Sequence, residues 1–304
     1  MNRQDWERLR IAVVGGDERE QEIARLAAAT GARVTAFGFP WPAEGIPDVE
    51  RVDTAAEALA GAHFGLLPIP LPAVPGHLYA PAVSEPIPLD DALLSTMAPG
   101  ATIFLGRSDD VLRAVADRCG IEIEDYDPDR ELMLLRGPAI VEGAIAAAIA
   151  NTRITLNHSP VAVLGYGNIG ALLVRALLGL GARVTVVARN PVQRAAAYAM
   201  GADALPFDEL AGHAGRFPIV FSTTAAGPIV VRPVLERLPD RSVVIDIAPP
   251  PGSVDFETAR SLGHTAVWAR GLGSRAPVTV GASQWYGLSR RIEERVARRE
   301  LART

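Results

Sequence analysis

Short apolar runs alternate with helical patterns along most of the chain. A run such as 11–14 enters a glycine turn, and apolar positions at helical spacing follow it. This alternation is typical of α/β proteins with parallel sheets. It predicts strands in segments 11–14, 32–39, 101–107, 161–164, 184–188, 218–224, 242–248 and 265–269.

Local signals mark the ends of several helices. Asp17, followed three residues later by Glu20, forms a capping box that predicts a helix through Ala29. Residues 111–119 have a helical pattern with a glycine just past its end. The alanine-rich segment 138–152 predicts another helix, with its proline in the first turn. Seven prolines in segment 66–90 predict a long, stiff loop instead.

Two such α/β units follow one another. We therefore expect an α/β protein of two Rossmann-like, doubly wound parallel-sheet domains joined by a linker helix. The N-terminal domain, 1–150, would bind substrate and dimerise, and the domain 151–282 would bind NAD(P). Segment 283–304 predicts a C-terminal helix that returns to the first domain. Its apolar stripe consists of Trp285, Leu288, Ile292 and Val296.

Composition narrows the function classes. The 304 residues are 49% hydrophobic and 21% charged, which allows a sizeable core, and the net charge of −5 argues against binding to duplex nucleic acid. All 30 basic residues are arginines, so lysine chemistry is excluded, and the single Cys119 excludes an internal disulfide. We find no apolar run of the about 20 residues that span a membrane and no signal-peptide core, and expect a cytoplasmic protein.

The strongest motif is a glycine turn between a strand and a helix. It consists of Gly165, Tyr166, Gly167, Asn168, Ile169 and Gly170. In such a turn the first glycine permits the sharp bend, the second lets a pyrophosphate approach the backbone, and the third lets the helix pack on the sheet. The anion then lies on free amides at the positive end of the helix. The motif predicts a dinucleotide site.

The residues after the next strand bear on the choice of dinucleotide. An NAD site usually has an acidic residue there, but this chain has Arg189 and Asn190. An arginine at this position favours the 2′-phosphate of NADP over NAD. Thr223 and Thr224 end another strand and would border the nicotinamide ribose, while Asp246 is either a cofactor contact or a structural carboxylate at a strand end.

Arginines provide candidate anchors for a small carboxylate. The turn that holds Asp17 and Arg19 has the place of a nucleotide turn but lacks the three glycines, so its amides and Arg19 would hold a carboxylate, unless it is only a turn of the fold. Further candidate anchors are Arg107, Arg136, Arg270 and Arg275. Glu142 and, second, His158 are candidate general bases. The five histidines lack the spacing of metal ligands, so we expect no metal.

Several of these segments together resemble the A subunit family of dipicolinate synthase from spore-forming bacteria. The likeness runs in order through IAVVGGDER, the triplet Val141-Glu142-Gly143, the glycine motif, VVIDIAPPPGSVDF and GLGSRAPVTVGA. It implies two Rossmann-like domains and the NADP-dependent oxidation of dihydrodipicolinate, or of its hydroxy-tetrahydro precursor, to dipicolinate. This reaction branches from the lysine pathway during sporulation. A flavoprotein-like B subunit is the implied partner, and a homo-oligomer is expected.

The chain departs from the family pattern in three places. RGPAI (136–140) stands where members have Asn-Ser-x-Pro-Thr, Pro250 replaces an arginine, and Val278 replaces a lysine. Arg136 and Arg275 would then replace the lost cations. Two alternatives follow: an NADP-dependent dehydrogenase of another small carboxylate, or a non-catalytic subunit that binds NADP.

Overall fold

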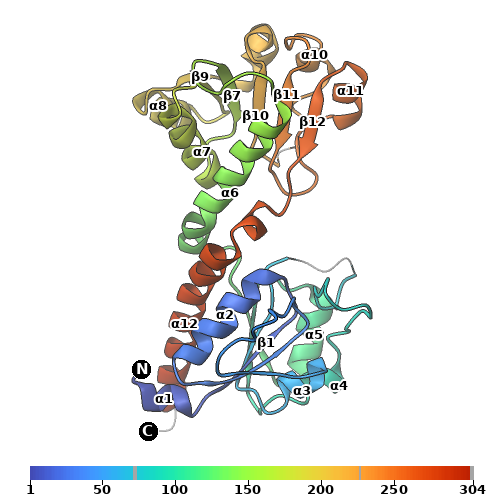
Figure 1. Cartoon of the computed structure of the whole chain (residues 1–304), viewed down its shortest axis with the longest axis vertical. Coiled ribbons are helices and arrows are strands. Elements are labelled where there is room, and N and C mark those ends of the chain that lie inside the picture. Colours follow the sequence, from blue (N-terminus) through green and yellow to red (C-terminus); the bar gives the residue numbers. More distant parts are fainter. Residues whose placement is uncertain (71–73, 226, 302–304) are drawn as a thin grey trace. The chain divides into compact units, whose positions relative to one another are not determined.

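The structure, a computed structural model, describes residues 1–70, 74–225 and 227–301. The chain divides into two compact units (Figure 1). The first unit comprises Met1–Arg136 and Ala276–Thr304, and the second comprises Gly137–Arg275. Residues 71–73 of the predicted proline-rich loop lie outside the described residues. Segments 67–70 and 74–90 contain no helix and no strand longer than one bridge.

Each unit contains one parallel sheet and the helices that cover it. The first unit has strands β1 (Arg10–Val14), β2 (Arg33–Phe37), β3 (Val49–Arg51), β4 (Phe64–Leu66), β5 (Thr102–Leu105) and β6 (Glu122–Asp125). Its helices are α1 (Arg3–Glu7), α2 (Glu18–Ala29), α3 (Ala55–Leu59), α4 (Asp91–Leu94), α5 (Asp110–Cys119) and α12 (Pro277–Leu301). Helix α6 (Arg130–Asn151) begins in the first unit and ends in the second.

The second unit repeats this plan. Its strands are β7 (Pro160–Leu164), β8 (Arg183–Val187), β9 (Asp203–Leu205), β10 (Ile219–Ser222), β11 (Val243–Asp246) and β12 (Thr265–Trp268). Its helices are α7 (Asn168–Gly179), α8 (Pro191–Ala199), α9 (Leu210–His213), α10 (Arg232–Leu235) and α11 (Phe256–Ser261), with short 3₁₀ turns at Phe207–Glu209, Ala214–Arg216 and Leu272–Arg275.

The two sheets have the same strand order. It is β3-β2-β1-β4-β5-β6 in the first unit and β12-β11-β10-β7-β8-β9 in the second, and all pairs of strands are parallel. In each sheet the winding direction reverses at one point, between β1 and β4 or between β7 and β10. Ligands of doubly wound sheets bind beyond the carboxyl ends of the strands at this switch point. The predicted fold class is confirmed.

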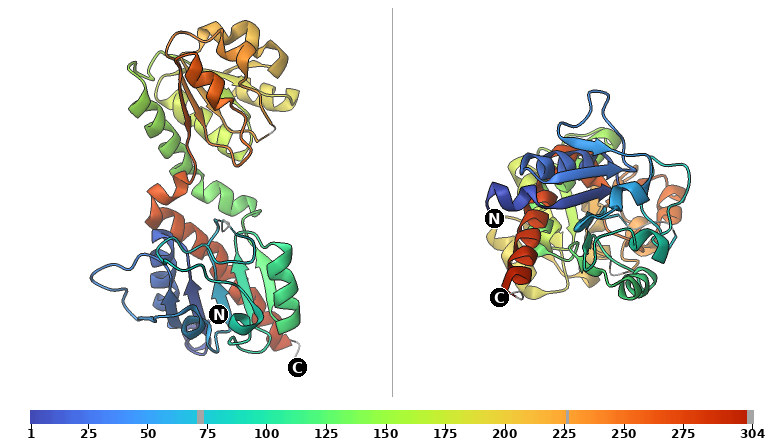
Figure 2. Two further views of the ribbon diagram at one scale, coloured as in Figure 1. Left: turned by 90° about the vertical axis from the view of Figure 1, so that its right-hand side faces the viewer. Right: turned by 90° about the horizontal axis from the view of Figure 1, so that it is seen from below.

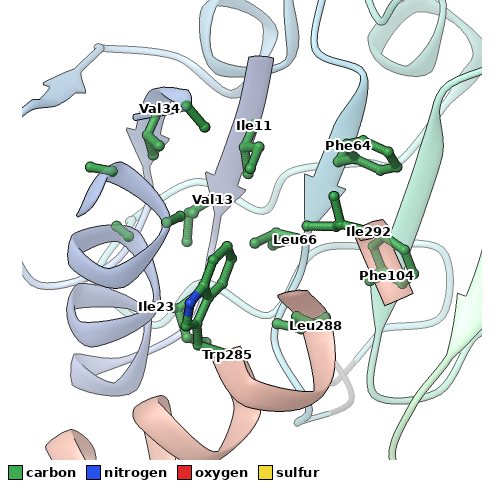
Figure 3. Packing of buried hydrophobic residues seen from close by; sticks show 14 of the residues in the cluster. Ile11, Val13, Ile23, Val34, Phe64, Leu66, Phe104, Trp285, Leu288 and Ile292 are labelled. Atoms are coloured by element: carbon green, nitrogen blue, oxygen red, sulfur yellow. The ribbon is translucent and has the colours of Figure 1, made fainter. Parts of the chain in front are cut away.

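Helix α12 completes the core of the first unit. Trp285, Leu288 and Ile292 lie against the sheet residues Ile11 and Leu66 in one buried cluster (Figure 3). The ring centroids of Trp285 and Trp6 are 5.9 Å apart, which ties α12 to α1. Both the beginning of the chain and α12 therefore lie in the first unit (Figure 2). The predicted apolar stripe is the face that α12 buries.

Helix α6 differs from the prediction in its length. It starts at Arg130, so Pro138 lies inside the helix and not in its first turn. The chain therefore passes from the first unit to the second within α6 and returns just before α12. These boundaries differ from the predicted domain boundaries at residues 150 and 282. Leu132 is buried in the core of the first unit and Val141 in that of the second, and burial of both ends favours one continuous helix over a break.

Helix α6 is long and apolar enough to cross a membrane, by length and composition alone, although no such run was expected from the sequence. Arginine and glutamate residues recur along it, and its buried residues pack in the two α/β cores. We conclude that α6 is a core helix of the kind that soluble α/β proteins contain.

Candidate active site

The glycine motif lies at the switch point of the second sheet. Strand β7 ends at Leu164, and the backbone of Gly165 then turns with a φ of +92°, in the left-handed region that glycine tolerates. Gly167 caps α7 without any side-chain hydrogen bond to the first turn of the helix. The first amides of α7 are therefore open to an external anion.

The space around each glycine fits the role that the sequence predicts for it. A Cβ atom on Gly165 would lie 2.6 Å from Oγ1 of Thr223, and one on Gly170 would lie 2.4 Å from the carbonyl oxygen of Gly165. A Cβ atom on Gly167 would meet nothing within 4 Å. The turn is therefore closed on the sheet side and open at the helix end, and the residues present fit a dinucleotide pyrophosphate.

The loop after β8 presents an uncompensated arginine. Arg189 is exposed and has no ion-pair partner among the described residues. Asn190 caps α8 by accepting a hydrogen bond from the amide of Val192. Arg194, which the sequence analysis did not single out, donates to the carbonyl oxygens of Ala188 and Arg189 at 2.8 and 2.7 Å and so fixes this loop.

Thr223 closes the site on the side of β10. Its amide and its hydroxyl both donate to the carbonyl oxygen of Leu164, at 2.9 and 3.0 Å, which joins the ends of β7 and β10. Thr224 follows and is half-buried. Both threonines therefore lie beside the glycine turn, where the nicotinamide ribose was expected.

Asp246 has a structural role in this structure. Its carboxylate is fully buried and accepts hydrogen bonds from the amides of Ala248 and Ser253, at 2.9 and 2.7 Å. Burial raises the pKa of Asp246, although these amides act in the opposite direction. Of the two predicted roles, the geometry favours the structural carboxylate, because both oxygens hold the loop after β11 and none is exposed to a cofactor.

The corresponding turn of the first unit is closed. The carbonyl oxygen of Tyr79 accepts a hydrogen bond from the amide of Gly16 at 2.7 Å, so chain from segment 66–90 covers the turn. A Cβ atom on Gly15 would lie 2.7 Å from Leu78, and one on Gly16 would overlap the carboxyl group of Glu20. This turn has no room for a pyrophosphate, which explains why only one dinucleotide site is expected.

A buried ion pair follows the closed turn. Arg19 donates from Nε and Nη2 to the two carboxylate oxygens of Asp17, both at 2.7 Å, and only 8% of Arg19 is exposed. Burial by itself would raise the pKa of Asp17, but the hydrogen bonds and charge of Arg19 hold it below its usual range. Asp17 also caps α2 with Glu20, as predicted. Arg19 therefore lies at the carboxyl edge of the first sheet with its charge already balanced.

A second arginine pair lies at the same edge. Asp127, just after β6, accepts a hydrogen bond from Nη2 of Arg136 at 2.5 Å and lies 3.9 Å from Nη2 of Arg107. The Arg136 side chain is 9% exposed, whereas that of Arg107 is 60% exposed. The first unit thus gathers three of the predicted carboxylate anchors, while Arg270 and Arg275 belong to the second unit.

The sequence analysis missed two polar residues of this edge. Tyr126 is buried, its hydroxyl accepts from Nε2 of Gln284 at 3.3 Å, and burial raises its pKa. Both residue types are common in cores, and 158 positions separate them along the chain. No local signal could therefore have paired them.

Glu142 and Arg275 lie together in the second unit. They form an ion pair between α6 and the 3₁₀ turn before α12, with exposed fractions of 66% and 45%. The candidate base and one candidate anchor are therefore partners of each other, and both remain accessible to a ligand.

The position of His158 makes it a wrong choice for the base. It precedes β7, whereas the glycine turn follows β7 at the other end of the strand, roughly 16 Å away at the rise of a parallel strand. His158 adopts a φ of +60°, and its carbonyl oxygen accepts from Nε of Arg183. His158 is the last residue of a turn at the amino edge of the second sheet.

Two different family models match the two units of the chain. Residues 10–126 match the family model of the N-terminal domain of the dipicolinate synthase A subunit. Residues 145–262 match the model of shikimate / quinate 5-dehydrogenase. The first match contains Asp17, Arg19 and Arg107, and the second contains the whole glycine motif.

Relatives of known structure extend the likeness to nearly the whole chain. The chain is 29% identical over 287 residues to the dipicolinate synthase A subunit of Bacillus subtilis, covering 94% of this chain and 96% of that protein. The crystal structure of the Bacillus subtilis protein has a TM-score of 0.84 at 28% identity, covering 95% and 97% of the two chains. That of transhydrogenase from Sinorhizobium meliloti, with a TM-score of 0.72 and 16% identity over 95% and 94%, shares the fold.

The dehydrogenase fold and the open glycine turn support a nicotinamide cofactor. The comparisons thus confirm the predicted resemblance to the family of dipicolinate synthase A subunits and identify the chain as an NAD(P)-dependent oxidoreductase.

Proposed function

We propose that this protein oxidises dihydrodipicolinate, or its hydroxy-tetrahydro precursor, to dipicolinate with NADP⁺. The observation that carries the proposal is the contrast between the two glycine turns: the second unit has an open one for a dinucleotide, and the first has a closed one beside buried arginines. Similarity to the dipicolinate synthase A subunit over 94% of the chain supports the choice of substrate.

In this proposal some residues bind the cofactor and the substrate, and Glu142 transfers a proton. The amides of Gly167 and Asn168 hold the pyrophosphate, and the bound nicotinamide ring supplies a hydride acceptor. Arg107, whose side chain is 60% exposed, and Arg136, whose Nε atom has no hydrogen-bond partner, hold substrate carboxylates as charge-assisted hydrogen-bond donors. Oxidation of the dihydro ring removes one hydride, which the nicotinamide cofactor would take up, and one proton, which Glu142 accepts. The hydroxy-tetrahydro precursor also loses one water molecule to reach the dihydro ring. Because the ring becomes aromatic, the protein mainly has to orient it and take up that proton.

The assay that tests the proposal generates dihydrodipicolinate in situ from pyruvate and aspartate semialdehyde. Reduced cofactor and dipicolinate are measured together, with NADP⁺ or NAD⁺, with and without a B subunit. We expect equal amounts of NADPH and dipicolinate. NADPH formed only from another small carboxylate would point to a different dehydrogenase, and tight NADP binding without any turnover would point to a non-catalytic role.

Arg189 sets the preference for NADP in this proposal. The Arg189→Ala variant is expected to bind NADP⁺ about 10- to 100-fold more weakly, because a charge-assisted hydrogen bond to the 2′-phosphate is lost. NAD⁺ affinity should stay the same. Isothermal titration calorimetry with both nucleotides measures the ratio. Arg175→Ala, at another exposed arginine of the same unit, is the control, and equal losses for both nucleotides would refute the assignment.

Glu142 is the proposed base. The Glu142→Gln variant should lose about 10²-fold or more of kcat, since general base catalysis typically contributes that much, with little change in nucleotide affinity. Glu131→Gln is the matched control, because Glu131 also lies on α6 and also pairs with an arginine, Arg290. Wild-type turnover by Glu142→Gln would exclude Glu142 as the base.

We further propose that the protein is cytoplasmic and acts as a homo-oligomer with a flavoprotein-like B subunit. The Bacillus subtilis relative is named as one lettered subunit of a synthase, which supports a second component. Size-exclusion chromatography of the chain alone and together with a B subunit tests both associations.

A further inference from the structure

Two arginines lie side by side at the amino edge of the first sheet. Arg10 begins β1 and Arg33 begins β2, and the parallel register pairs these two residues directly. Like charges at paired positions of neighbouring strands repel each other and destabilise the sheet. Many arginines of the first unit have an acidic partner, but Arg10 and Arg33 form no ion pair with any described residue. Their two charges therefore lack a counterion.

A cavity joins this pair to the turn before β4. Its volume is about 430 Å³, which is within the range of sites for small molecules. A Cβ atom on Gly61, in that turn, would lie 3.0 Å from Nη1 of Arg10. The missing side chain at this position thus leaves room for the guanidinium group. The described residues that line the cavity are Glu7, Arg8, Arg10, Arg33, Gly61 and His63.

The charge of this cavity is strongly positive. Arg8 adds a third guanidinium group that has no ion-pair partner in the part of the chain that the structure describes. Glu7 lines the same cavity, but it forms an ion pair with Arg3 at 3.3 Å. Three uncompensated cations therefore line one cavity, in a chain whose net charge is −5. We call Arg8, Arg10 and Arg33 the arginine cluster.

Acidic residues nearby do not neutralise the arginine cluster. Glu50 and Glu57 line a second cavity, of about 510 Å³, together with Arg10 and Arg33. Oε2 of Glu57 accepts hydrogen bonds from two backbone amides at the start of α3. Neither glutamate forms an ion pair with an arginine of the described ranges. The counterion of the cluster must therefore come from outside this part of the chain.

His63 provides a neutral donor beside the cluster. Its Nδ1 atom accepts a hydrogen bond from the amide of Arg10 at 3.0 Å, so Nε2 carries the ring hydrogen. Burial, together with the charges of Arg10 and Arg299, lowers the pKa of His63, which keeps the ring neutral at physiological pH. The ring thus ties the start of β4 to β1 at the position where the two arginines meet.

We propose that the arginine cluster binds a small phosphoryl anion. Guanidinium groups match phosphate oxygens in bidentate pairs, and three cations balance an anion of more than one charge, whereas one arginine is enough for a carboxylate. The anion is inorganic phosphate, pyrophosphate or the phosphate end of a nucleotide. The net charge of −5 argues against a nucleic acid as its source.

This site is separate from the proposed active site. Arg107 and Arg136 lie at the carboxyl edge of the first sheet, whereas the arginine cluster lies at its amino edge. A bound anion would remove the repulsion between the starts of β1 and β2 and would stabilise the first unit. The inference therefore goes beyond the proposed function and can be tested without turnover.

Calorimetric titration of the full chain with pyrophosphate tests the site. The parent protein carries Gly167→Asp, which blocks the anion site at the open glycine turn of the second unit. Ionic strength is held constant with chloride, because salt screens exposed charges. We expect Arg10→Gln and Arg33→Gln each to bind pyrophosphate about tenfold more weakly than the parent. Arg130→Gln, at an exposed arginine at the start of α6, should keep the affinity of the parent.

Thermal unfolding tests the repulsion itself. Without phosphate, Arg10→Gln and Arg33→Gln should unfold at the same temperature as the parent or at a higher one, because one of two repelling charges is gone. This result would also show that both variants fold. Pyrophosphate should raise the unfolding temperature of the parent and of Arg130→Gln, and should raise that of the two cluster variants much less.

The remaining outcomes identify the source of the anion or overturn the inference. Tighter binding of ADP than of pyrophosphate would support a nucleotide, and equal or weaker binding would support a free anion. No binding of either probe by the parent would overturn the inference. Binding that is equal in the parent, Arg10→Gln and Arg33→Gln would overturn it as well, since the anion would then lie elsewhere.

Discussion

The Gly167→Asp variant is expected to fold normally and to bind NADP⁺ about 100-fold more weakly, which corresponds to about 2.7 kcal/mol. Gly167 has a φ of −85°, which any residue adopts, and a Cβ atom there meets nothing within 4 Å. An aspartate at this position would also cap α7, which favours the helix. In the cofactor complex its charge would instead face the pyrophosphate.

Calorimetric titration with NADP⁺ and thermal unfolding together measure this effect. Gly179→Asp adds the same charge at the other end of α7, where a Cβ atom also meets nothing, and should keep the wild-type affinity. Affinity within threefold of the wild type in Gly167→Asp would mean that the dinucleotide does not lie on the first turn of α7. Gly170→Ala should differ from both variants by destabilising the second unit, because its Cβ atom would overlap the carbonyl oxygen of Gly165.

The Leu288→Ala variant is expected to lower the free energy of unfolding of the first unit by about 3 kcal/mol. Leu288 is fully buried between α12 and the first sheet (Figure 3), and its truncation leaves a cavity in that core. Urea unfolding followed by tryptophan fluorescence reports mainly on the first unit, which contains Trp6, Trp41 and Trp285. NADP⁺ affinity should not change, because the glycine motif lies in the second unit.

Tyr286 supplies the control for this experiment. It lies on the same helix with 48% of its surface exposed, so Tyr286→Ala should cost less than about 1 kcal/mol. A loss as small in Leu288→Ala would show that α12 is not part of the core of the first unit. The assignment of the chain from Ala276 onward to the first unit would then be wrong.

Sequence reasoning located the motifs whose residues lie close together in the chain. The capping box of Asp17 and Glu20 and the turn from Gly165 to Gly170 each lie within a few residues, so strand–turn–helix periodicity is enough to place them. The stripe on α12 has the period of a helix and was predicted for the same reason. The short strands β3, β4, β6 and β9 were not predicted, because none of them is an uninterrupted run of large apolar residues.

Roles that depend on distant partners were less predictable. His158 was considered as a base because it lies near the motif in sequence, yet the strand between them places the two at opposite edges of the sheet. The sequence allowed Asp246 to be either a cofactor contact or a structural carboxylate. Only the two backbone amides that donate to its carboxylate distinguish these roles. Glu142 and Arg275 were given separate roles, although 133 positions of chain fold back to pair them.

The sequence by itself determined the two α/β units, the single open glycine turn and the absence of lysine chemistry, because each depends on residue types or on local spacing. Only the tertiary structure decided which carboxylates and arginines neutralise one another and that Tyr126 meets Gln284. The physical reason is that burial and ion pairing depend on packing between distant segments. The same packing gives Glu20 two properties that its place in a capping box does not: a raised pKa and an unpaired oxygen.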